Sequence, residues 1–117
     1  MSAQGQPLAL VTGAVGGIGA AIVARLLHDG LRVLALDRDE EGLEALAAQH
    51  ASISICAFDL AQLDATPDLL ADLVQVHGVP TRLALNAGVW PGASIAKMTD
   101  EVWSLNFAVN VTSPFAF

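Results

Sequence analysis

Four glycines after a short apolar run are the first residues in the chain whose type and spacing suit chemistry. Leu8–Thr12 is a mostly apolar run of a length typical of a buried strand, and it is followed by Gly13, Gly16, Gly17 and Gly19. Glycine lets a main chain approach a ligand closely, and the free N–H groups at a helix start bind phosphate. The pattern predicts a strand that turns through glycines into a helix around a pyrophosphate.

Two charged residues after the second apolar run bear on which nucleotide the glycines would hold. Asp37 lies 18 positions beyond Gly19, close to the spacing at which a carboxylate reaches the ribose hydroxyls of a dinucleotide. The carboxylate favours NAD over NADP because it would repel the extra phosphate, whereas Arg38 would attract that phosphate. Asp37 has an alternative role as the N-cap of the next helix, and one carboxylate can serve both roles.

Strands and helices that alternate along the chain must position these residues. Strands are predicted at Leu8–Thr12, Arg32–Leu36, Ile53–Phe58 and Arg82–Asn86. Helices are predicted from Gly17 to a C-cap at Gly30, across Leu43, Leu46 and Ala47, from an N-cap at Thr66 to Gly78, and from Thr99 to the last residue. This alternation is typical of right-handed βαβ units and a parallel sheet.

The composition fits one covered sheet and argues against some partners. A chain of 117 residues has room for one domain, residues 1–117, and 54% hydrophobic content suits strands buried on both faces. The net charge of -7 would repel nucleic acid and an anionic membrane surface, so neither is expected as a partner. The single Cys56 is interpreted as a small buried hydrophobe, and we expect a reducing, cytoplasmic setting.

Hydropathy alone would also allow residues 8–27 to be an export or membrane segment. Met1–Pro7 contains no Lys or Arg, although a signal peptide needs a positive charge before its apolar run. The four glycines would each cost a helix about 1 kcal/mol relative to alanine. Polar residues at the ends of the next three predicted strands, namely Asp37, Asp59 and Asn86, favour a strand, turn and helix inside a protein.

Four motifs, in the right order and on the right elements, resemble the classical short-chain dehydrogenase/reductase family. Residues 12–19, TGAVGGIG, match its TGxxxGxG turn, Asp59-Leu60 its acidic pair after the third strand, and Asn86-Ala87-Gly88 its NNAG motif. Asn110 resembles the helix asparagine that helps to hold a proton-relay water. The resemblance covers nearly the whole chain and implies a Rossmann-type, doubly wound α/β fold. Its partial parallel sheet would have four strands in spatial order 3-2-1-4, with helices on both faces.

The resemblance also implies an activity, a cofactor and a set of site residues. It implies NAD(H)-dependent hydride transfer between a carbonyl and an alcohol, with a small-molecule substrate, a homo-oligomeric assembly and Asn110 as the catalytic residue. The glycine turn would contact the pyrophosphate, Asp37 the adenosine ribose, and Asp59-Leu60 the adenine. The cofactor-binding residues predicted on this basis are Gly13, Val15, Gly16, Gly17, Ile18, Gly19, Asp37, Arg38, Asp59, Leu60, Asn86, Ala87 and Gly88.

The chain departs from the family's pattern at several places. Leu85 replaces the first asparagine of NNAG, Ser113 stands where glycine is common, and Val15 takes the place of the usual basic residue. The family moves the hydroxyl proton with a tyrosine whose pKa is lowered by a nearby lysine. This sequence has no tyrosine, and its only lysine, Lys97, falls in a predicted loop. We therefore expect the cofactor-binding half of a longer protein, truncated before the catalytic Tyr/Lys segment, inactive alone, with an open edge at its fourth strand.

Two other classes of protein stay open at this point. Transferases that use S-adenosylmethionine also place a glycine turn after one strand and an acid after the next. They usually carry an acidic residue before the glycines, whereas Leu10, Val11 and Thr12 precede them here. A non-catalytic nucleotide-binding module would need neither tyrosine nor lysine.

Histidine and tryptophan residues are the remaining candidates for chemistry. His28, His50 and His77 fall near the C-terminal ends of predicted helices, where the helix dipole favours imidazolium, so no metal site is expected. Trp90 follows the fourth strand, where ligands bind in such sheets, and lines a substrate pocket in one interpretation. Trp103 is interpreted as a core residue or a subunit contact.

Overall fold

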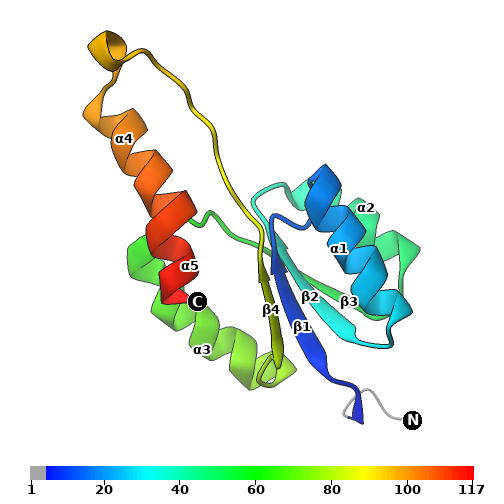
Figure 1. Cartoon of the computed structure of the whole chain (residues 1–117). Helices are drawn as coiled ribbons and strands as arrows, with labels where there is room; N and C mark the ends of the chain where they lie inside the picture. The colour runs from blue at the N-terminus through cyan, green and yellow to red at the C-terminus, as the bar shows by residue number, and fades with distance from the viewer. Residues whose placement is uncertain (1–4) are drawn as a thin grey trace.

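The computed structural model describes residues 5–117 and shows a parallel sheet with helices on both faces (Figure 1). The elements in chain order are β1 (Leu8–Thr12), α1 (Gly17–His28), β2 (Arg32–Asp37), α2 (Glu40–Gln49), β3 (Ile53–Ala57), α3 (Thr66–His77), β4 (Arg82–Leu85), α4 (Asp100–Phe107) and α5 (Ser113–Ala116). Short 3₁₀ turns lie at Leu63–Ala65 and Ile95–Lys97, and a π-helical turn joins α4 to α5 at Ala108–Thr112.

The four strands lie in the order β3-β2-β1-β4 and all pairs are parallel, which confirms the predicted topology. Thr12, the last residue of β1, lies opposite Leu36 of β2 and Leu85 of β4. Because parallel strands end at the same edge, this register gathers the residues that follow β1, β2 and β4 at one place. The glycine turn, Asp37 and Asn86 therefore meet at the carboxyl edge of the sheet.

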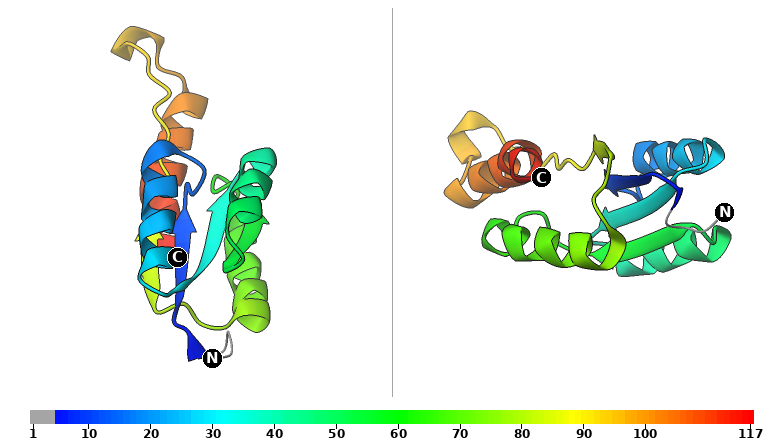
Figure 2. Two further views of the ribbon diagram at one scale, coloured as in Figure 1. Left: turned by 90° about the vertical axis from the view of Figure 1, so that its right-hand side faces the viewer. Right: turned by 90° about the horizontal axis from the view of Figure 1, so that it is seen from below.

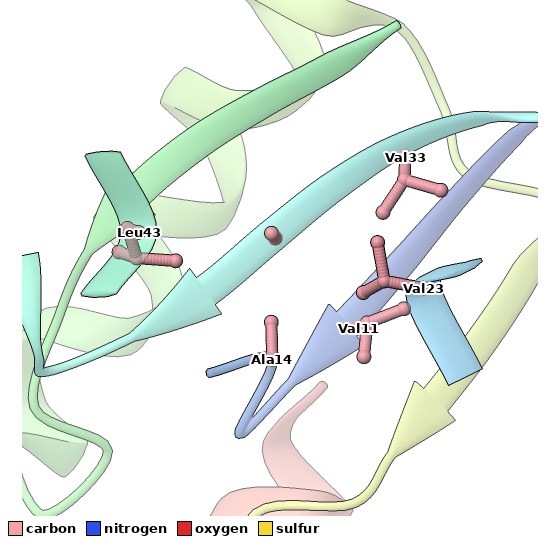
Figure 3. Close-up of a cluster of buried hydrophobic side chains, with 6 residues drawn as sticks. Val11, Ala14, Val23, Val33 and Leu43 are labelled. Carbon is pink, nitrogen blue, oxygen red and sulfur yellow. The ribbon is translucent and has the colours of Figure 1, made fainter. Parts of the chain in front are cut away.

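Successive strand residues point into two different hydrophobic clusters, one on each face of the sheet. The first cluster lies under α1 and α2 and consists of Val11, Ala14, Val23, Val33, Ala35 and Leu43 (Figure 3). The second lies under α3 and consists of Leu8, Leu10, Leu34, Leu36 and Leu73. Every residue of β1 is buried for this reason, and a strand covered on both faces is apolar without interruption.

The apolar stretch at the start of the chain forms β1, the glycine turn and α1. Helix α1 is 12 residues long and ends in a Schellman motif, in which Gly30 N donates to Leu27 O at 3.0 Å and Leu31 N to Leu26 O at 3.1 Å. Gly30 takes a φ of 89°, but the cap residue is Asp29, one position before the predicted one. Among residues 5–117, no helix combines the length and the apolar character that a bilayer span requires.

The ends of several predicted elements are wrong by one residue or more. Strand β2 includes Asp37, β3 stops before Phe58, and β4 stops before Asn86, whose N–H turns back to Ala84 O at 3.0 Å. Thr66 is the first residue of α3 rather than its N-cap, because the 3₁₀ turn before it runs straight into the helix. Its hydroxyl donates to Gln62 O at 3.1 Å.

The last predicted helix is three segments rather than one. Thr99 is the N-cap of α4, and its hydroxyl oxygen accepts from Val102 N at 3.2 Å, so the predicted start is right. The helix then widens into the π-helical turn Ala108–Thr112 before α5. Such turns insert a residue into a helix and reorient the side chains beyond them, and they often occur at functional sites.

Cys56 packs against the second cluster from the α3 face of β3, which agrees with the predicted packing role but not with the predicted burial. It is partly buried, and burial raises the pKa of its thiol above the usual range. A thiol with a raised pKa is a poor nucleophile at neutral pH, which fits a packing role.

Strand β4 is an edge of the sheet in the part of the chain that the structure describes, since its one neighbour is β1. Leu83 and Leu85 of this strand are exposed. The segment after β4 and helix α4 project beyond the sheet (Figure 2), which gives the molecule extents of 57 × 27 × 21 Å. The predicted open edge is therefore present.

Candidate functional site

The glycine turn is held tightly against the end of β4. Gly13 has a φ of 66°, a left-handed conformation that favours glycine, and a Cβ at this position would lie 2.8 Å from the Cα of Ala87. A Cβ on Gly19 would clash with the carbonyl oxygen of Gly13 and lie 2.7 Å from its carbonyl carbon. Both glycines are therefore required for the first turn of α1 to pack against the strand ends.

The start of α1 presents main-chain N–H groups to an open groove. The earlier N–H groups of the turn have partners: Gly16 N donates to Gly13 O at 3.3 Å, and Ala14 N donates to Leu36 O at 3.2 Å. The first three residues of a helix have no intrahelical acceptor for their N–H groups. Here they are Gly17, Ile18 and Gly19, the N-cap Gly16 has no side chain, and the first turn holds no acidic residue. The arrangement suits an anion.

Asp37 is held by two main-chain donors and does not cap a helix. Its Oδ2 accepts from Val15 N at 3.1 Å, and its Oδ1 accepts from Asp39 N at 3.0 Å. The N-cap of α2 is Asp39, whose Oδ1 accepts from Gly42 N at 3.0 Å. The alternative role predicted for Asp37, the N-cap of this helix, is therefore wrong, and its carboxylate is free to meet a ligand.

Asn86 and Thr12 tie the end of β4 to the glycine turn. Asn86 Nδ2 donates to Thr12 O at 3.4 Å and to Gly13 O at 3.3 Å, and Ala87 N donates to Thr12 Oγ1 at 3.1 Å. These bonds span more than seventy positions of sequence. Leu85, where the family's pattern has another asparagine, pairs with Thr12 through the main chain but has no polar side-chain atom, so the side-chain hydrogen bonds to the turn come from Asn86.

Two adjoining hollows lie at the carboxyl edge of the sheet. An open groove follows the glycine turn and is lined by Gly13, Gly16, Gly17, Ile18, Gly19, Asp37, Asn86, Ala87 and Gly88. A more enclosed cavity of about 110 Å³ is lined by Gly13, Asp37, Arg38, Phe58, Asp59, Leu60, Ala87, Gly88, Val89 and Val109. The two share the residues at their junction, Gly13, Asp37, Ala87 and Gly88. All predicted cofactor-binding residues except Val15 line one hollow or both.

Val15 faces away from both hollows. It packs against the first hydrophobic cluster, and a Cβ on Gly42 would clash with its Cγ1. Its contribution to the site is its N–H group, which holds Asp37. The structure thus places this residue behind the carboxylate and out of reach of the hollows.

Sequence reasoning missed the apolar walls of the enclosed cavity. Phe58, Val89 and Val109 line it, and each directly follows or precedes a motif residue. Phe58 adjoins Asp59, whose Oδ1 accepts from Ala61 N at 2.9 Å and so fixes the turn after β3. Their adjacency to motif residues was the one signal in the sequence, because ligand pockets are lined mostly by apolar side chains with a few polar groups among them.

Asn110 lies in the π-helical turn and forms hydrogen bonds with the segment that follows β4. Its Oδ1 accepts from Val89 N and its Nδ2 donates to Val89 O, both at 2.9 Å. Asn106, one turn earlier, donates to Pro91 O at 3.3 Å. Asn110 does not line either hollow, but its side chain contacts Val89 and lies beside Gly88, two residues that line the cavity.

Replacing Asn110 with alanine should release this segment. The change removes two hydrogen bonds to Val89, each of which contributes about 1 kcal/mol. We expect the free energy of unfolding to fall by about 1 to 2 kcal/mol and the Val89 amide to lose protection from hydrogen exchange. Thr112→Ala, an exposed change in the same π-helical turn, should leave both quantities nearly unchanged, and equal effects of the two variants would contradict the contact.

The histidines and tryptophans do not join the site. His28 and His77 end α1 and α3, and His50 is the C-cap of α2, as predicted. Within residues 5–117, no group of three His, Cys, Asp or Glu side chains lies close enough to hold a metal ion. Trp90 is almost fully exposed, and Trp103 is 58% exposed with its ring 5.0 Å from that of Phe107. A core position for Trp103 is therefore wrong.

Comparisons with known proteins show the family to which the chain belongs. Residues 7–117 match the family model described as short chain dehydrogenase. A cis-2,3-dihydrobiphenyl-2,3-diol dehydrogenase of Rhodococcus globerulus is 36% identical over 107 residues, which cover 83% of this chain and 38% of that protein. The chain spans less than half the length of the curated relatives it matches.

Two solved structures are similar over nearly all of the chain. A metagenomic short-chain oxidoreductase in complex with NADP has 35% identity and a TM-score of 0.86, over 94% of this chain and 52% of that one. A variant of actinorhodin polyketide ketoreductase with NADPH has 33% identity and a TM-score of 0.88, over 99% of this chain and 46% of that one. With the family model matched from residue 7 to residue 117, this chain belongs to the short-chain dehydrogenase family.

Proposed function

We propose that this chain binds a nicotinamide dinucleotide in its two hollows and prefers NAD(H) to NADP(H). The observation that carries the preference is the Asp37 carboxylate. It lies at the junction of the hollows, capping no helix. A carboxylate there accepts hydrogen bonds from ribose hydroxyls and repels a phosphate on the same ribose.

The rest of the dinucleotide follows from this position. The pyrophosphate would lie over the open N–H groups of Gly17, Ile18 and Gly19, and the adenine would enter the cavity beside Asp59 and Leu60. The nicotinamide half would run along Asn86-Ala87-Gly88, which the hydrogen bonds to Thr12 and Gly13 hold in place. Arg38, on the rim of the adenine cavity, has no acid paired with it among the salt bridges of residues 5–117 and gives NADP a weaker alternative.

The reaction we propose for the whole protein is hydride transfer between a carbonyl and an alcohol, with the nicotinamide as the carrier of the hydride. This chain would supply the cofactor-binding half as one domain, residues 1–117. Asn110 would contribute to the catalytic side by holding Gly88 and Val89 in place. Since the sequence has no tyrosine, the proton-transferring tyrosine of the family would come from elsewhere, and this chain alone would be inactive.

Assembly and cellular setting stay predictions. The exposed edge of β4 supports pairing with a further strand or another copy. A cytoplasmic setting rests on the single cysteine alone. The substrate would be a small alcohol or carbonyl compound, and the Rhodococcus globerulus relative supports this because its name is that of a diol dehydrogenase.

A titration with three ligands tests the proposed function. NADH, NADPH and S-adenosylmethionine would each be titrated into the chain by calorimetry, and the expected order of affinity is NADH, then NADPH, then S-adenosylmethionine. Carbonyl reduction by the chain alone is expected to be absent. Tighter binding of S-adenosylmethionine would favour the transferase class, and turnover by these 117 residues would refute the assignment of catalysis to residues outside them.

A further inference from the structure

Gly42, in the first turn of α2, is a glycine that neither the motifs nor the backbone explains. Glycine costs a helix about 1 kcal/mol relative to alanine, and Gly42 is not among the residues with a positive φ. The space around it gives the reason. A Cβ at this position would clash with Val15 Cγ1 and would lie 2.6 Å from Asp39 Oδ2.

The two residues that crowd Gly42 are the two that hold Asp37. Val15 N donates to one oxygen of the Asp37 carboxylate, and Asp39 N donates to the other. Asp39 is also bound to Gly42 directly, because its Oδ1 accepts from Gly42 N. A single missing methyl group therefore lets the glycine turn and the start of α2 close on the carboxylate from opposite sides.

This closure fixes how the carboxylate presents itself to a ligand. Each carboxylate oxygen has two acceptor positions, and one on each is taken by a main-chain N–H. The remaining positions stay available for two neighbouring hydroxyl groups. The terminal torsion of an aspartate is broad, so the two main-chain donors, rather than a rotamer preference, decide which way those positions face.

We propose that Gly42 is a positioning residue for nucleotide choice: the space at its Cα lets Val15 and Asp39 orient the Asp37 carboxylate toward a ribose diol. This inference rests on the proposed binding of NAD(H). It extends specificity to a residue that lines neither hollow and acts through the packing behind them.

The variant Gly42→Ala tests the inference. Its new methyl group must push aside the side chains of Val15 and Asp39, and we expect the Kd for NADH to rise about tenfold, the equivalent of one weakened hydrogen bond to a charged group. The Kd for NADPH should change by less than about twofold, because its ribose phosphate gains nothing from the oriented carboxylate. The clash should lower the free energy of unfolding of Gly42→Ala. Helix propensity alone would raise it, since alanine favours the helix.

A double variant separates the clash from other effects of alanine. Val15→Ala removes the Cγ1 that the new methyl group meets and leaves the Asp39 carboxylate, the end of a rotatable side chain, as a close contact. The Kd of Val15→Ala/Gly42→Ala for NADH should therefore return to within about threefold of that of Val15→Ala alone, a coupling that a mutant cycle measures. Gly92→Ala, whose Cβ would have no neighbour closer than 3.6 Å, is the control and should bind NADH as the parent does.

Hydrogen exchange of the Val15 amide, measured without any nucleotide, keeps the inference separate from the proposed function. We expect Gly42→Ala to reduce the protection of this amide and Gly92→Ala to leave it unchanged. Unchanged protection in Gly42→Ala, or NADH binding equal to that of the parent, would overturn the role of Gly42. If Gly42→Ala loses protection but the parent chain binds no NADH, the proposed function is refuted and the contact still stands.

Discussion

Replacing Gly19 with alanine is expected to destabilise the chain by about 3 kcal/mol or more and to abolish dinucleotide binding. The added methyl group would clash with the carbonyl oxygen of Gly13 and lie 3.0 Å from the Cα of Ala14. Both are main-chain atoms in a turn that hydrogen bonds from Asn86 hold in place. Since no flexible side chain can move aside, α1 must shift away from the strand ends, and its open N–H groups shift with it.

Thermal unfolding checks this expectation against a matched control. Gly17→Ala adds the same methyl group two positions earlier, where a Cβ meets nothing within 4 Å. We expect the Tm of Gly19→Ala to fall by about 10 °C or more and that of Gly17→Ala to stay near the parent value. Equal melting temperatures would contradict the close approach of α1 to the turn. NADH titration of Gly19→Ala then reports the loss of the anion site.

The topology follows from local patterns that the sequence displays directly. Strands β1 and β2 are buried on both faces, so each reads as an apolar run, and the helices between the strands fix a parallel sheet. Element ends are less visible, because they depend on contacts between distant segments. Asn86 leaves β4 since it turns to bind Thr12 and Gly13, and no local propensity encodes that partner.

The candidate site divides in the same way. The glycines and the polar residues at strand ends can be predicted from residue type and spacing, and they do line the two hollows. The N-cap of α2 is Asp39 rather than Asp37, because Asp37 is still within β2 and its carboxylate accepts from Val15 N. Gly42 could not be found from sequence, since its role is an empty space whose neighbour lies 27 positions earlier.

Replacing Asp37 with asparagine should reverse or abolish the preference for NADH. The change keeps the shape of the side chain, removes its charge and replaces one of the two oxygens that accept from Val15 N and Asp39 N with an amide donor. Hydrogen bonds to a charged group contribute about 1.5 to 3 kcal/mol, so we expect the Kd for NADH to rise between about tenfold and a hundredfold. The Kd for NADPH should stay level or fall, because the repulsion of its ribose phosphate disappears while Arg38 remains on the cavity rim.

Salt and a charge-matched control separate the two contributions of Asp37. Glu40→Gln removes one negative charge from the exposed first turn of α2, and we expect it to change the ratio of the two Kd values by less than about threefold.

Raising the salt from 0.1 M to 1 M shortens the Debye length from about 10 Å to about 3 Å. Discrimination against NADPH by the parent should therefore narrow in high salt, since it arises from repulsion. The loss of NADH affinity in Asp37→Asn should persist, because a direct hydrogen bond is screened far less than a through-space repulsion. A ratio of Kd values that Asp37→Asn and Glu40→Gln changed equally would show that net charge, and not this carboxylate, selects the nucleotide.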